Sequence, residues 1–297
     1  MGSDAGHTSV LLAESLELLA VRPGGLWVDG TVGLGGHAAA ILRASAPDGR
    51  LVGLDRDGET LERARATLEE FAGRVRLEQA DFREIPERLA GEAPDGILLD
   101  LGISSAQLDD PARGFSFQAE GPLDMRIDRT SPTTAADLVN GMRESELADL
   151  IYEYGGERAS RRIARAIVRA REQEPIRTTT RLAELVRRAA PRGRRRGLHP
   201  ATRTFQALRI RTNRELDSLG EAIETAALTL APRGRMAVIA FHSLEDRAVK
   251  QSFRALAGRG FRALTRKPLR PGAEETRRNP RARSARLRAI AREEALS

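Results

Sequence analysis

The sequence of 297 residues contains no cysteine. Disulfide bonds, thiolate metal sites and cysteine nucleophiles are therefore excluded together, and the composition is typical of a reducing compartment. A metal site would have to use the four histidines and the carboxylates, but no H-x-x-x-H or paired carboxylate spacing is present. We therefore expect that the protein binds no metal.

A long apolar run is also missing from the sequence. No segment approaches the roughly 20 apolar residues that cross a bilayer. Residues Met1 to Leu12 lack the basic and apolar regions of a secretion signal. We expect a cytoplasmic protein with no membrane partner.

Positive charge is what the sequence has in excess, because its formal net charge is +7. Positive potential attracts polyanions and so favours a nucleic-acid partner, although a merely solvated surface is the alternative. Two basic stretches stand out, at Arg192–Gly197 and Arg262–Arg288. The first contains Arg194, Arg195 and Arg196, and we expect it to be an unpacked loop that binds nucleic-acid phosphates.

Residues 26 to 100 alternate short apolar runs with helical stretches, which is typical of consecutive βαβ units around a parallel sheet. The apolar runs predict strands at Leu26–Asp29, Leu51–Asp55, Val75–Ala80, Gly96–Leu101 and, much later, Arg235–Phe241. Right-handed crossovers bring the carboxyl ends of parallel strands to one edge, where open sheets bind ligands. Acidic residues stand at or just after four of these ends, at Asp29, Asp55, Asp81 and Asp100. The pattern predicts an α/β, Rossmann-like fold.

The segment between the fourth and fifth predicted strands is too long for one crossover and has a helical pattern. Apolar residues at 147, 150, 151 and 154 have the spacing of a buried helical stripe. A second stripe begins at Leu182, with Thr179 or Thr180 as the predicted cap. We therefore predict a discontinuous Rossmann-like domain of residues 1–112 and 213–297, and an inserted helical substrate-recognition subdomain of residues 113–212. A further helix is predicted over Gly58–Phe71.

A glycine-rich turn, Asp29-Gly-Thr-Val-Gly-Leu-Gly-Gly-His37, follows the first strand and opens a helix. Glycines there let backbone amides approach a ligand at the positive end of the helix. The turn alone leaves three interpretations open: a methyl-donor site, a dinucleotide site with Asp55 on the ribose, or a merely tight turn. Asp81, Phe82 and Asp100 favour a methyl donor, because adenine needs an acceptor and an apolar face. Each Asp taken singly fits a helix cap equally well.

Motifs outside the turn are more specific, and with them the chain resembles the bacterial 16S ribosomal RNA cytosine-N4 methyltransferases, the family known as MraW or RsmH. The matching residues extend over nearly the whole sequence. They are His7-Thr-Ser-Val-Leu-Leu, Gly35-Gly-His37, Asp100 through Asp110, Gly114-Phe-Ser-Phe, Gly121-Pro-Leu-Asp-Met-Arg126, His199-Pro-Ala-Thr-Arg-Thr-Phe-Gln206, Phe241-His-Ser-Leu-Glu-Asp-Arg247 and Asn279-Pro-Arg-Ala-Arg-Ser284.

The resemblance implies S-adenosylmethionine as the methyl donor and the small ribosomal subunit as the partner. The implied methyl acceptor is the N4 amine of a cytosine in the P site of the decoding centre of 16S ribosomal RNA. The absence of cysteine agrees with a nitrogen target, since methylation of cytosine carbon 5 commonly begins with attack by a thiolate. The cofactor contacts implied by matching positions are Gly35, Gly36, His37, Asp55, Phe82, Asp100 and Gln107.

The chemistry of cytosine N4 suggests further site residues. Its lone pair is delocalised into the ring, so a catalytic group must accept hydrogen bonds from the amine, and Asp100 is the first candidate, with Asp109 the second. The base must also leave its stack, which favours an aromatic or guanidinium lid. The residues expected to form this lid are Phe115, Phe117, Arg203 and Phe205. Packing in the core, or at the hinge of the insertion, is the alternative for these four.

Two other functions stay open at this point. One is an NAD-dependent oxidoreductase that uses Gly33, Gly35 and Asp55. The other is a non-catalytic ribosome assembly factor that has kept a nucleotide pocket. The sequence fixes no oligomeric state, and a homodimer is compatible with it.

Overall fold

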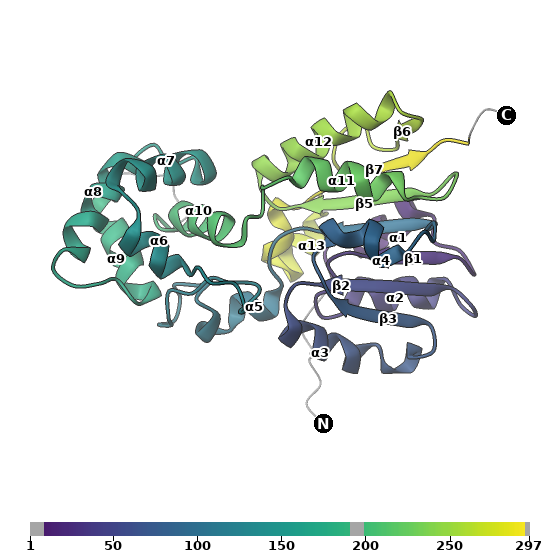
Figure 1. Ribbon diagram of the computed structural model, residues 1–297, viewed down its shortest axis with the longest axis horizontal. Helices are drawn as coiled ribbons and strands as arrows, with labels where there is room; N and C mark the ends of the chain where they lie inside the picture. The colour runs from purple at the N-terminus through teal and green to yellow at the C-terminus, as the bar shows by residue number, and fades with distance from the viewer. Residues whose placement is uncertain (1–8, 191–198, 295–297) are drawn as a thin grey trace. The chain divides into compact units, whose positions relative to one another are not determined.

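The computed structural model describes residues 9–190 and 199–294, which belong to two compact units (Figure 1). One unit comprises Met1–Gly102 and Leu216–Ser297, and the other comprises Ile103–Glu215. The second unit therefore interrupts the first in the sequence. Within the described ranges, no helix is long and apolar enough to cross a membrane.

The first unit is built on a seven-stranded sheet with the strand order β3-β2-β1-β4-β5-β7-β6. The parallel strands are β1 (Leu26–Asp29), β2 (Arg50–Asp55), β3 (Val75–Gln79), β4 (Gly96–Asp100) and β5 (Arg235–Ala240). Their ends differ from the predicted ones by at most one residue. The predicted α/β, Rossmann-like fold class is confirmed.

Strands β6 (Phe261–Ala263) and β7 (Arg286–Arg292) were not predicted, because arginines interrupt the apolar pattern of β7. β7 runs antiparallel to both β5 and β6. Arg288 is only 8% exposed in this strand, and its Nε donates to Asp246 Oδ1 at 2.7 Å. A charge can occupy a buried strand position when an opposite charge pairs with it.

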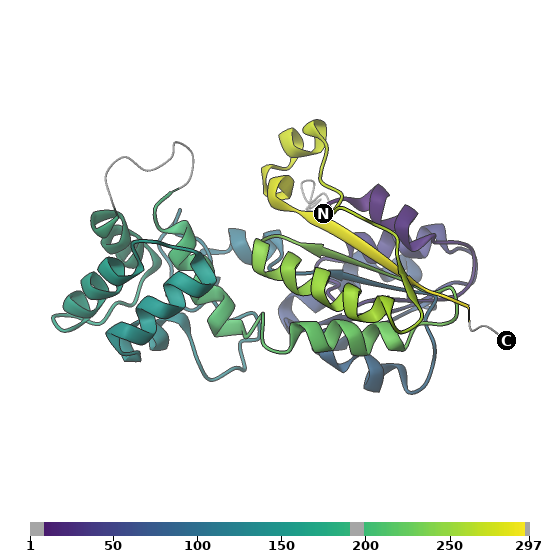
Figure 2. The same cartoon turned by 90° about the horizontal axis from the view of Figure 1, so that it is seen from above.

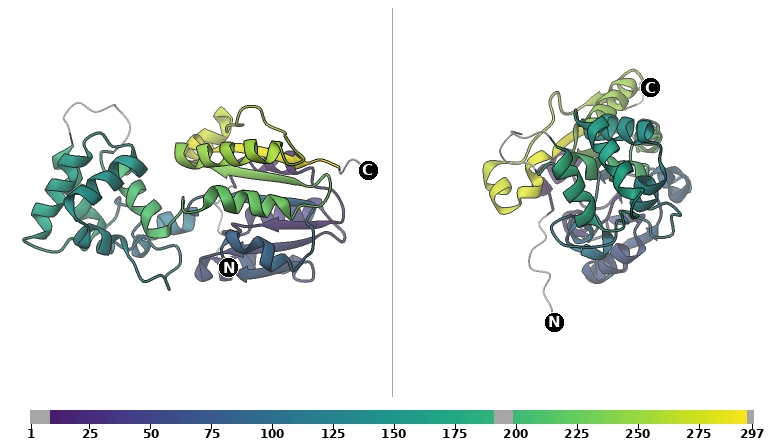
Figure 3. Two further views of the ribbon diagram at one scale, coloured as in Figure 1. Left: turned by 45° about the horizontal axis from the view of Figure 1, so that its top comes forward. Right: turned by 90° about the vertical axis from the view of Figure 1, so that its left-hand side faces the viewer.

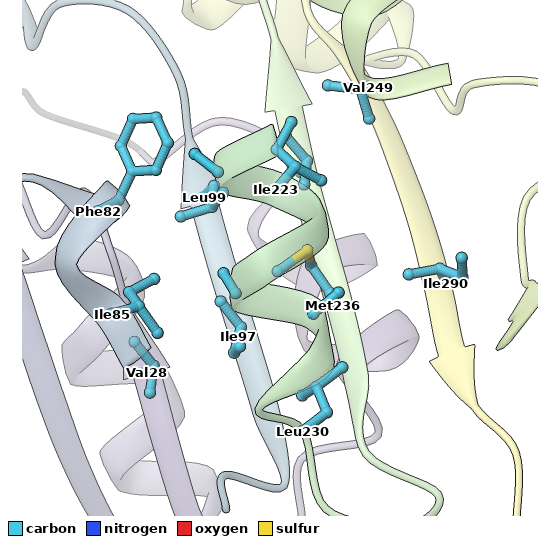
Figure 4. Packing of buried hydrophobic residues seen from close by; sticks show 14 of the residues in the cluster. Val28, Phe82, Ile85, Ile97, Leu99, Ile223, Leu230, Met236, Val249 and Ile290 are labelled. Atoms are coloured by element: carbon cyan, nitrogen blue, oxygen red, sulfur yellow. The ribbon is translucent and has the colours of Figure 1, made fainter. Parts of the chain in front are cut away.

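Alternating strand residues build a separate core on each face of the sheet. Val28, Ile97 and Val238 lie in the core shown in Figure 4, whereas their neighbours Trp27 and Leu98 lie in the core of the opposite face. The first face is covered by α4 (Ile85–Leu89), α11 (Leu219–Leu228) and α12 (Ser243–Ala257). The other is covered by α1 (Leu12–Leu19), α2 (Gly36–Ala44) and α3 (Gly58–Thr67). Figures 2 and 3 show α11 and α12 side by side.

Short elements complete the first unit. The predicted helix over Gly58–Phe71 is wrong at its end, because α3 stops at Thr67 and a separate 3-10 turn follows. The start of α3 is fixed by Asp57, whose carboxylate accepts from the backbone N–H groups of two residues in the first turn. The remaining elements are η1 (Glu69–Phe71), η2 (Phe82–Glu84), α13 (Ala273–Arg278) and η4 (Pro280–Ser284).

The second unit is helical. Its elements are α5 (Ser105–Asp109), η3 (Pro111–Arg113), α6 (Ala135–Gly141), α7 (Glu144–Gly155), α8 (Ser160–Arg171), α9 (Thr179–Ala189) and α10 (Thr202–Asn213). The buried stripes of α7 and α9 meet in one apolar core. The N-cap of α9 is Thr178, so the predicted cap at Thr179 or Thr180 is wrong. Thr179 is buried, and its hydroxyl donates to the carbonyl of Ala119 instead.

Candidate active site

The carboxyl ends of four neighbouring strands in the first unit carry acidic side chains or lead directly to one. Asp29, Asp55 and Asp100 are the last residues of β1, β2 and β4. The loop after β5 leads into α12, whose first turn contains Glu245. Because β2, β1, β4 and β5 are adjacent and parallel, these groups gather at one edge of the sheet.

The glycine-rich turn between β1 and α2 is closed by its own hydrogen bonds. The N–H of Gly33 donates to Asp55 Oδ2 at 2.8 Å, and the N–H of Gly35 donates to the carbonyl of Val32 at 2.8 Å. Gly35 caps α2 with a φ of 88°, a backbone conformation that residues with a Cβ rarely adopt. A Cβ on Gly36 would lie 2.1 Å from Ser9 Oγ. The backbone N–H groups of Gly33 and Gly35 already donate hydrogen bonds within the turn, which disfavours a pyrophosphate contact at these two glycines.

Asp29 is almost completely buried beneath this edge. Its side chain accepts from the backbone N–H of Thr31 at 3.1 Å, while its Oδ2 has no hydrogen-bond partner among the described residues. Burial raises the pKa of Asp29 to about 7, and repulsion by Asp55 adds to the shift, although the hydrogen bond from Thr31 opposes it. The ionised form of Asp29 is therefore unfavourable in the folded protein.

We expect Asp29→Asn to raise the free energy of unfolding at about pH 8 and to leave it unchanged below about pH 4. The folded pKa lies above the ordinary value, so the folded protein loses stability as pH rises through the window between the ordinary pKa and about 7. The shift corresponds to at most about 4 kcal/mol. Urea unfolding at both pH values measures the difference. An equal change at the two pH values would contradict the assignment.

Asp55 connects the glycine-rich turn to the end of β2. Its Oδ2 accepts from Gly33, and its Oδ1 accepts from the backbone N–H of Asp57 at 2.9 Å. Burial raises the pKa of Asp55 to about 6 in spite of these hydrogen bonds, which favour the ionised form. Each carboxylate oxygen has a second lone pair, so Asp55 keeps acceptor capacity for a ligand.

Asp100 lies beside Asp29 at the end of β4. Its backbone N–H donates to Thr31 Oγ1 at 2.6 Å, and its Oδ1 is buried without a hydrogen bond from any described residue. Burial, followed by repulsion from Asp29 and Glu245, raises the pKa of Asp100 well above its ordinary value. Without a cation nearby, this carboxyl group therefore tends to hold a proton.

His37 lies next to Asp100 and has a defined tautomer when it is neutral. Its Nε2 is 3.0 Å from the carbonyl oxygen of Val10, which can only accept, so Nε2 carries the hydrogen. Nδ1 is then an acceptor, and it lies 3.8 Å from Asp100 Oδ2. The buried ring of His37 therefore contacts both Val10, which precedes α1, and Asp100 among the acidic side chains at this edge of the sheet, which we call the acidic edge.

Glu245 and His242, for which the sequence pattern predicted no catalytic or cofactor-binding role, complete this edge. Glu245 is 1% exposed, and its Oε2 accepts from the backbone N–H groups of Phe241 and His242 at 2.8 and 3.2 Å. His242 in turn caps α12. The H-x-x-E spacing after a strand resembles a capping box and was the available signal. Proximity to Asp100 could not be inferred from it, since only the pairing of β4 with β5 brings them together.

The charges at this edge of the sheet distinguish between S-adenosylmethionine and NAD as the cofactor. Asp100 is repelled by both Asp29 and Glu245, and Asp29 and Asp100 each have a buried oxygen without a hydrogen bond from the described residues. A positively charged ligand relieves this repulsion. The anionic pyrophosphate of a dinucleotide would increase it. The residues present therefore fit a sulfonium-containing methyl donor and disfavour NAD.

Asp81 and Phe82 follow β3 as predicted, but their side chains have structural partners. Asp81 caps η2 in a capping box with Glu84 and forms ion pairs with Arg83 and Arg56. The Phe82 ring is buried in the core of one sheet face, as Figure 4 shows. A contact of Phe82 with the cofactor remains a prediction.

The other predicted site residues belong to the second unit. Gln107 is buried and forms a capping box with Ser104 at the start of α5. Asp109 ends the same helix and is exposed.

The four predicted lid residues differ in burial. Phe115 and Phe205 are 6% and 4% exposed and lie in the helical core, which is the structural alternative for them. Phe117 is partly exposed, and its ring centroid lies 4.6 Å from that of His199 and 4.8 Å from that of Phe205. Arg203 is exposed and donates to the carbonyl of Gly156. The predicted phosphate contacts Arg194, Arg195 and Arg196 lie outside the described residues.

Comparisons of the sequence with a family model and with known relatives agree on one family. The sequence model of the MraW methylase family matches residues 4–293. The chain is 53% identical to the ribosomal RNA small subunit methyltransferase H of Syntrophotalea carbinolica, over 96% of this chain and 98% of that protein. It is 51% identical to the protein of the same name from Symbiobacterium thermophilum, over 96% of each chain. A solved putative rRNA-methylase from Clostridium thermocellum aligns over 97% of this chain and 98% of its own at 11% identity, with a TM-score of 0.47, too low to add to the assignment.

Proposed function

The chain belongs to the MraW methylase family and is an S-adenosylmethionine-dependent ribosomal RNA methyltransferase; we propose that it methylates the N4 amine of a cytosine in the decoding centre of 16S ribosomal RNA. The proposal rests on one observation at the carboxyl edge of the sheet. The Oδ1 of Asp100, the last residue of β4, accepts no hydrogen bond from the described residues. An exocyclic amine needs such an acceptor. The absence of cysteine also removes the thiolate that carbon-5 methylation commonly uses.

The residues around the glycine-rich turn would hold the methyl donor. S-adenosylmethionine, when bound, supplies an electrophilic methyl group on a positively charged sulfur. Gly35, Gly36 and His37 form the start of α2, whose first turn contains no acidic residue and whose positive end attracts the carboxylate of the methionine part. Asp55 would accept from the ribose hydroxyls, because each of its oxygens keeps a lone pair. Phe82 and Gln107 are the remaining proposed contacts.

Asp100 would orient the cytosine amine. A carboxylate that accepts an N–H hydrogen bond draws the nitrogen away from conjugation with the ring, and its lone pair becomes available to the methyl group. Fixing the amine in line with the methyl group and sulfur lowers the barrier by supplying orientation in advance. Asp109 remains the second candidate for this role.

Asp100 would also receive the proton that the reaction releases. The nitrogen–carbon bond forms as the carbon–sulfur bond breaks, so positive charge moves from sulfur to the amine, which must then lose a proton. A cation beside Asp100 favours the ionised carboxylate, and that stabilisation is lost when the sulfur becomes neutral. Its pKa then returns toward the raised value set by burial, Asp29 and Glu245, so the carboxylate can take the proton.

Donor affinity should weaken as pH falls. Only ionised Asp55 can accept from both ribose hydroxyls, and its pKa is about 6. With a pKa of about 6, the ionised fraction falls from about one half at pH 6 to about one tenth at pH 5, so Kd should rise by about fivefold over this interval. Calorimetry with the neutral product S-adenosylhomocysteine isolates this ribose contribution from the charge of the sulfur. Asp55→Asn should lose this pH dependence, and a pH-independent Kd in the parent protein would contradict the role.

The acceptor is tested by transfer of labelled methyl groups to small ribosomal subunits that lack the modification. The proposal requires label in 16S ribosomal RNA, in amounts approaching one methyl group per subunit. Label in ribosomal protein alone would overturn it. A parallel reaction with protein-free 16S ribosomal RNA identifies the form of the RNA that is the substrate.

A further inference from the structure

Helix α8 in the second unit carries a row of arginines on one face. Arg158 in the preceding turn and Arg162, Arg165 and Arg169 in the helix are spaced by four, three and four residues. At about 100° per residue, this spacing places the three helical arginines within a sector of about 60°, and Arg158 precedes them in the turn. We call these four residues the arginine row. All four are exposed.

The apolar side of α8 is already used by the fold. Ile163, Ala164 and Ile167 are fully buried in the core of the helical unit, where α8 packs against α7 and α9 (Figure 1). The helical members of the arginine row, Arg162, Arg165 and Arg169, lie on the opposite side of the helix. An amphipathic helix needs a free apolar face to enter a membrane interface, and α8 has none to offer.

Three members of the row have no acidic partner among the described residues, namely Arg158, Arg162 and Arg169. The fourth, Arg165, lies 3.6 Å from Glu144. Some other exposed arginines of the unit are paired, as Arg143 is with Glu146 and Arg161 with Asp149. Three positive charges without an acidic partner therefore lie along this one surface, and its helical part from Arg162 to Arg169 spans about 10 Å at the helical rise. A helix surface with that charge is complementary to a line of phosphates rather than to a single anion.

We propose that the arginine row binds the phosphate backbone of the ribosomal RNA substrate. The inference rests on the proposed function, because it assigns a contact surface to the same substrate. Arginine suits this task, since its planar guanidinium donates to phosphate oxygens in pairs. The row contributes affinity and orientation without reading the base sequence.

The test uses the full chain with Arg158, Arg162 and Arg169 replaced by Gln, and measures binding of 16S ribosomal RNA over a salt series. Three lost phosphate contacts should reduce the slope of log K against log salt by about 2 to 3. The Kd at about 150 mM salt should rise by about tenfold or more. The affinity for S-adenosylmethionine should not change. Gln is a good helix former, so the variant should fold normally.

The matched control replaces Arg143, Arg161 and Arg188 by Gln. These exposed arginines of the same unit are paired with Glu146, Asp149 and Glu184, and their replacement changes the net charge equally. The control should lower the salt slope by less than about 1.

Several results would overturn the inference. Equal losses in the two triple variants would mean that general charge, and not the row, binds RNA. Normal binding of protein-free RNA with weakened binding of small subunits would assign the row to a ribosomal protein. Failure of the parent chain to methylate small subunits is a different result, since it overturns the proposed function itself.

Discussion

Asp100→Asn is expected to lower the rate of methyl transfer by about 10²- to 10⁴-fold, the range of a lost acid–base group, while making the protein more resistant to unfolding near pH 8. The Asn side chain has one acceptor oxygen where the carboxylate has two, and it cannot take the proton from the methylated amine. The gain in stability has a separate cause. Asn is neutral, so it removes the repulsion with Asp29 and Glu245 that raises the pKa of Asp100.

Three measurements together distinguish this role of Asp100 from a structural one. Single-turnover kinetics report methyl transfer, thermal unfolding reports stability, and calorimetry reports donor binding. Asp100→Asn should weaken binding of cationic S-adenosylmethionine more than binding of the neutral product, because only the former gains from the carboxylate. Near-normal turnover, or a loss of activity explained by unfolding, would remove Asp100 from the mechanism.

Asp55→Asn is expected to raise the Kd for S-adenosylmethionine by about 100-fold. Two hydrogen bonds from ribose hydroxyls to a charged acceptor contribute about 1.5 to 3 kcal/mol each, and each 1.4 kcal/mol is tenfold in affinity. Asn keeps one acceptor oxygen, so part of this interaction remains. The loss should be similar for S-adenosylhomocysteine, which contains the same ribose.

Asp48→Asn is the matched control for Asp55→Asn. Asp48 is an exposed residue before the amino end of β2, so its replacement changes the charge equally at the opposite edge of the sheet. Its Kd should stay within about twofold of the parent, as expected for a surface charge. An unchanged Kd in a folded Asp55→Asn variant would place the ribose elsewhere.

The sequence was informative where structure is determined locally. Short apolar runs predicted β1 to β5 nearly to the residue, and they placed Asp29, Asp55 and Asp100 at strand ends. Strand β7 was missed because Arg288 breaks its apolar pattern, and its partner Asp246 lies 42 residues away in the sequence.

The environment of the acidic edge depends on contacts between distant segments. The spacing of Asp29 and Asp100 could not show that Thr31 bonds to both, nor that Glu245 raises the pKa of Asp100. The contact between His37 and Val10 is also long-range. The aromatic pattern suggested that Phe115 and Phe205 could close over a base, whereas packing uses both rings in the helical core. Apolar rings that serve a ligand and rings that fill a core look alike in a sequence.

The central claim is that this chain transfers a methyl group to cytosine N4, and nucleoside mass spectrometry tests it most directly. Small ribosomal subunits lacking the modification are incubated with the chain and methyl-labelled S-adenosylmethionine, and their RNA is digested to nucleosides. We predict labelled N4-methylcytidine from the decoding centre, absent with Asp100→Asn. Label on 5-methylcytidine or another nucleoside, or no label despite tight donor binding, would contradict the claim, and the last result would favour a non-catalytic assembly factor.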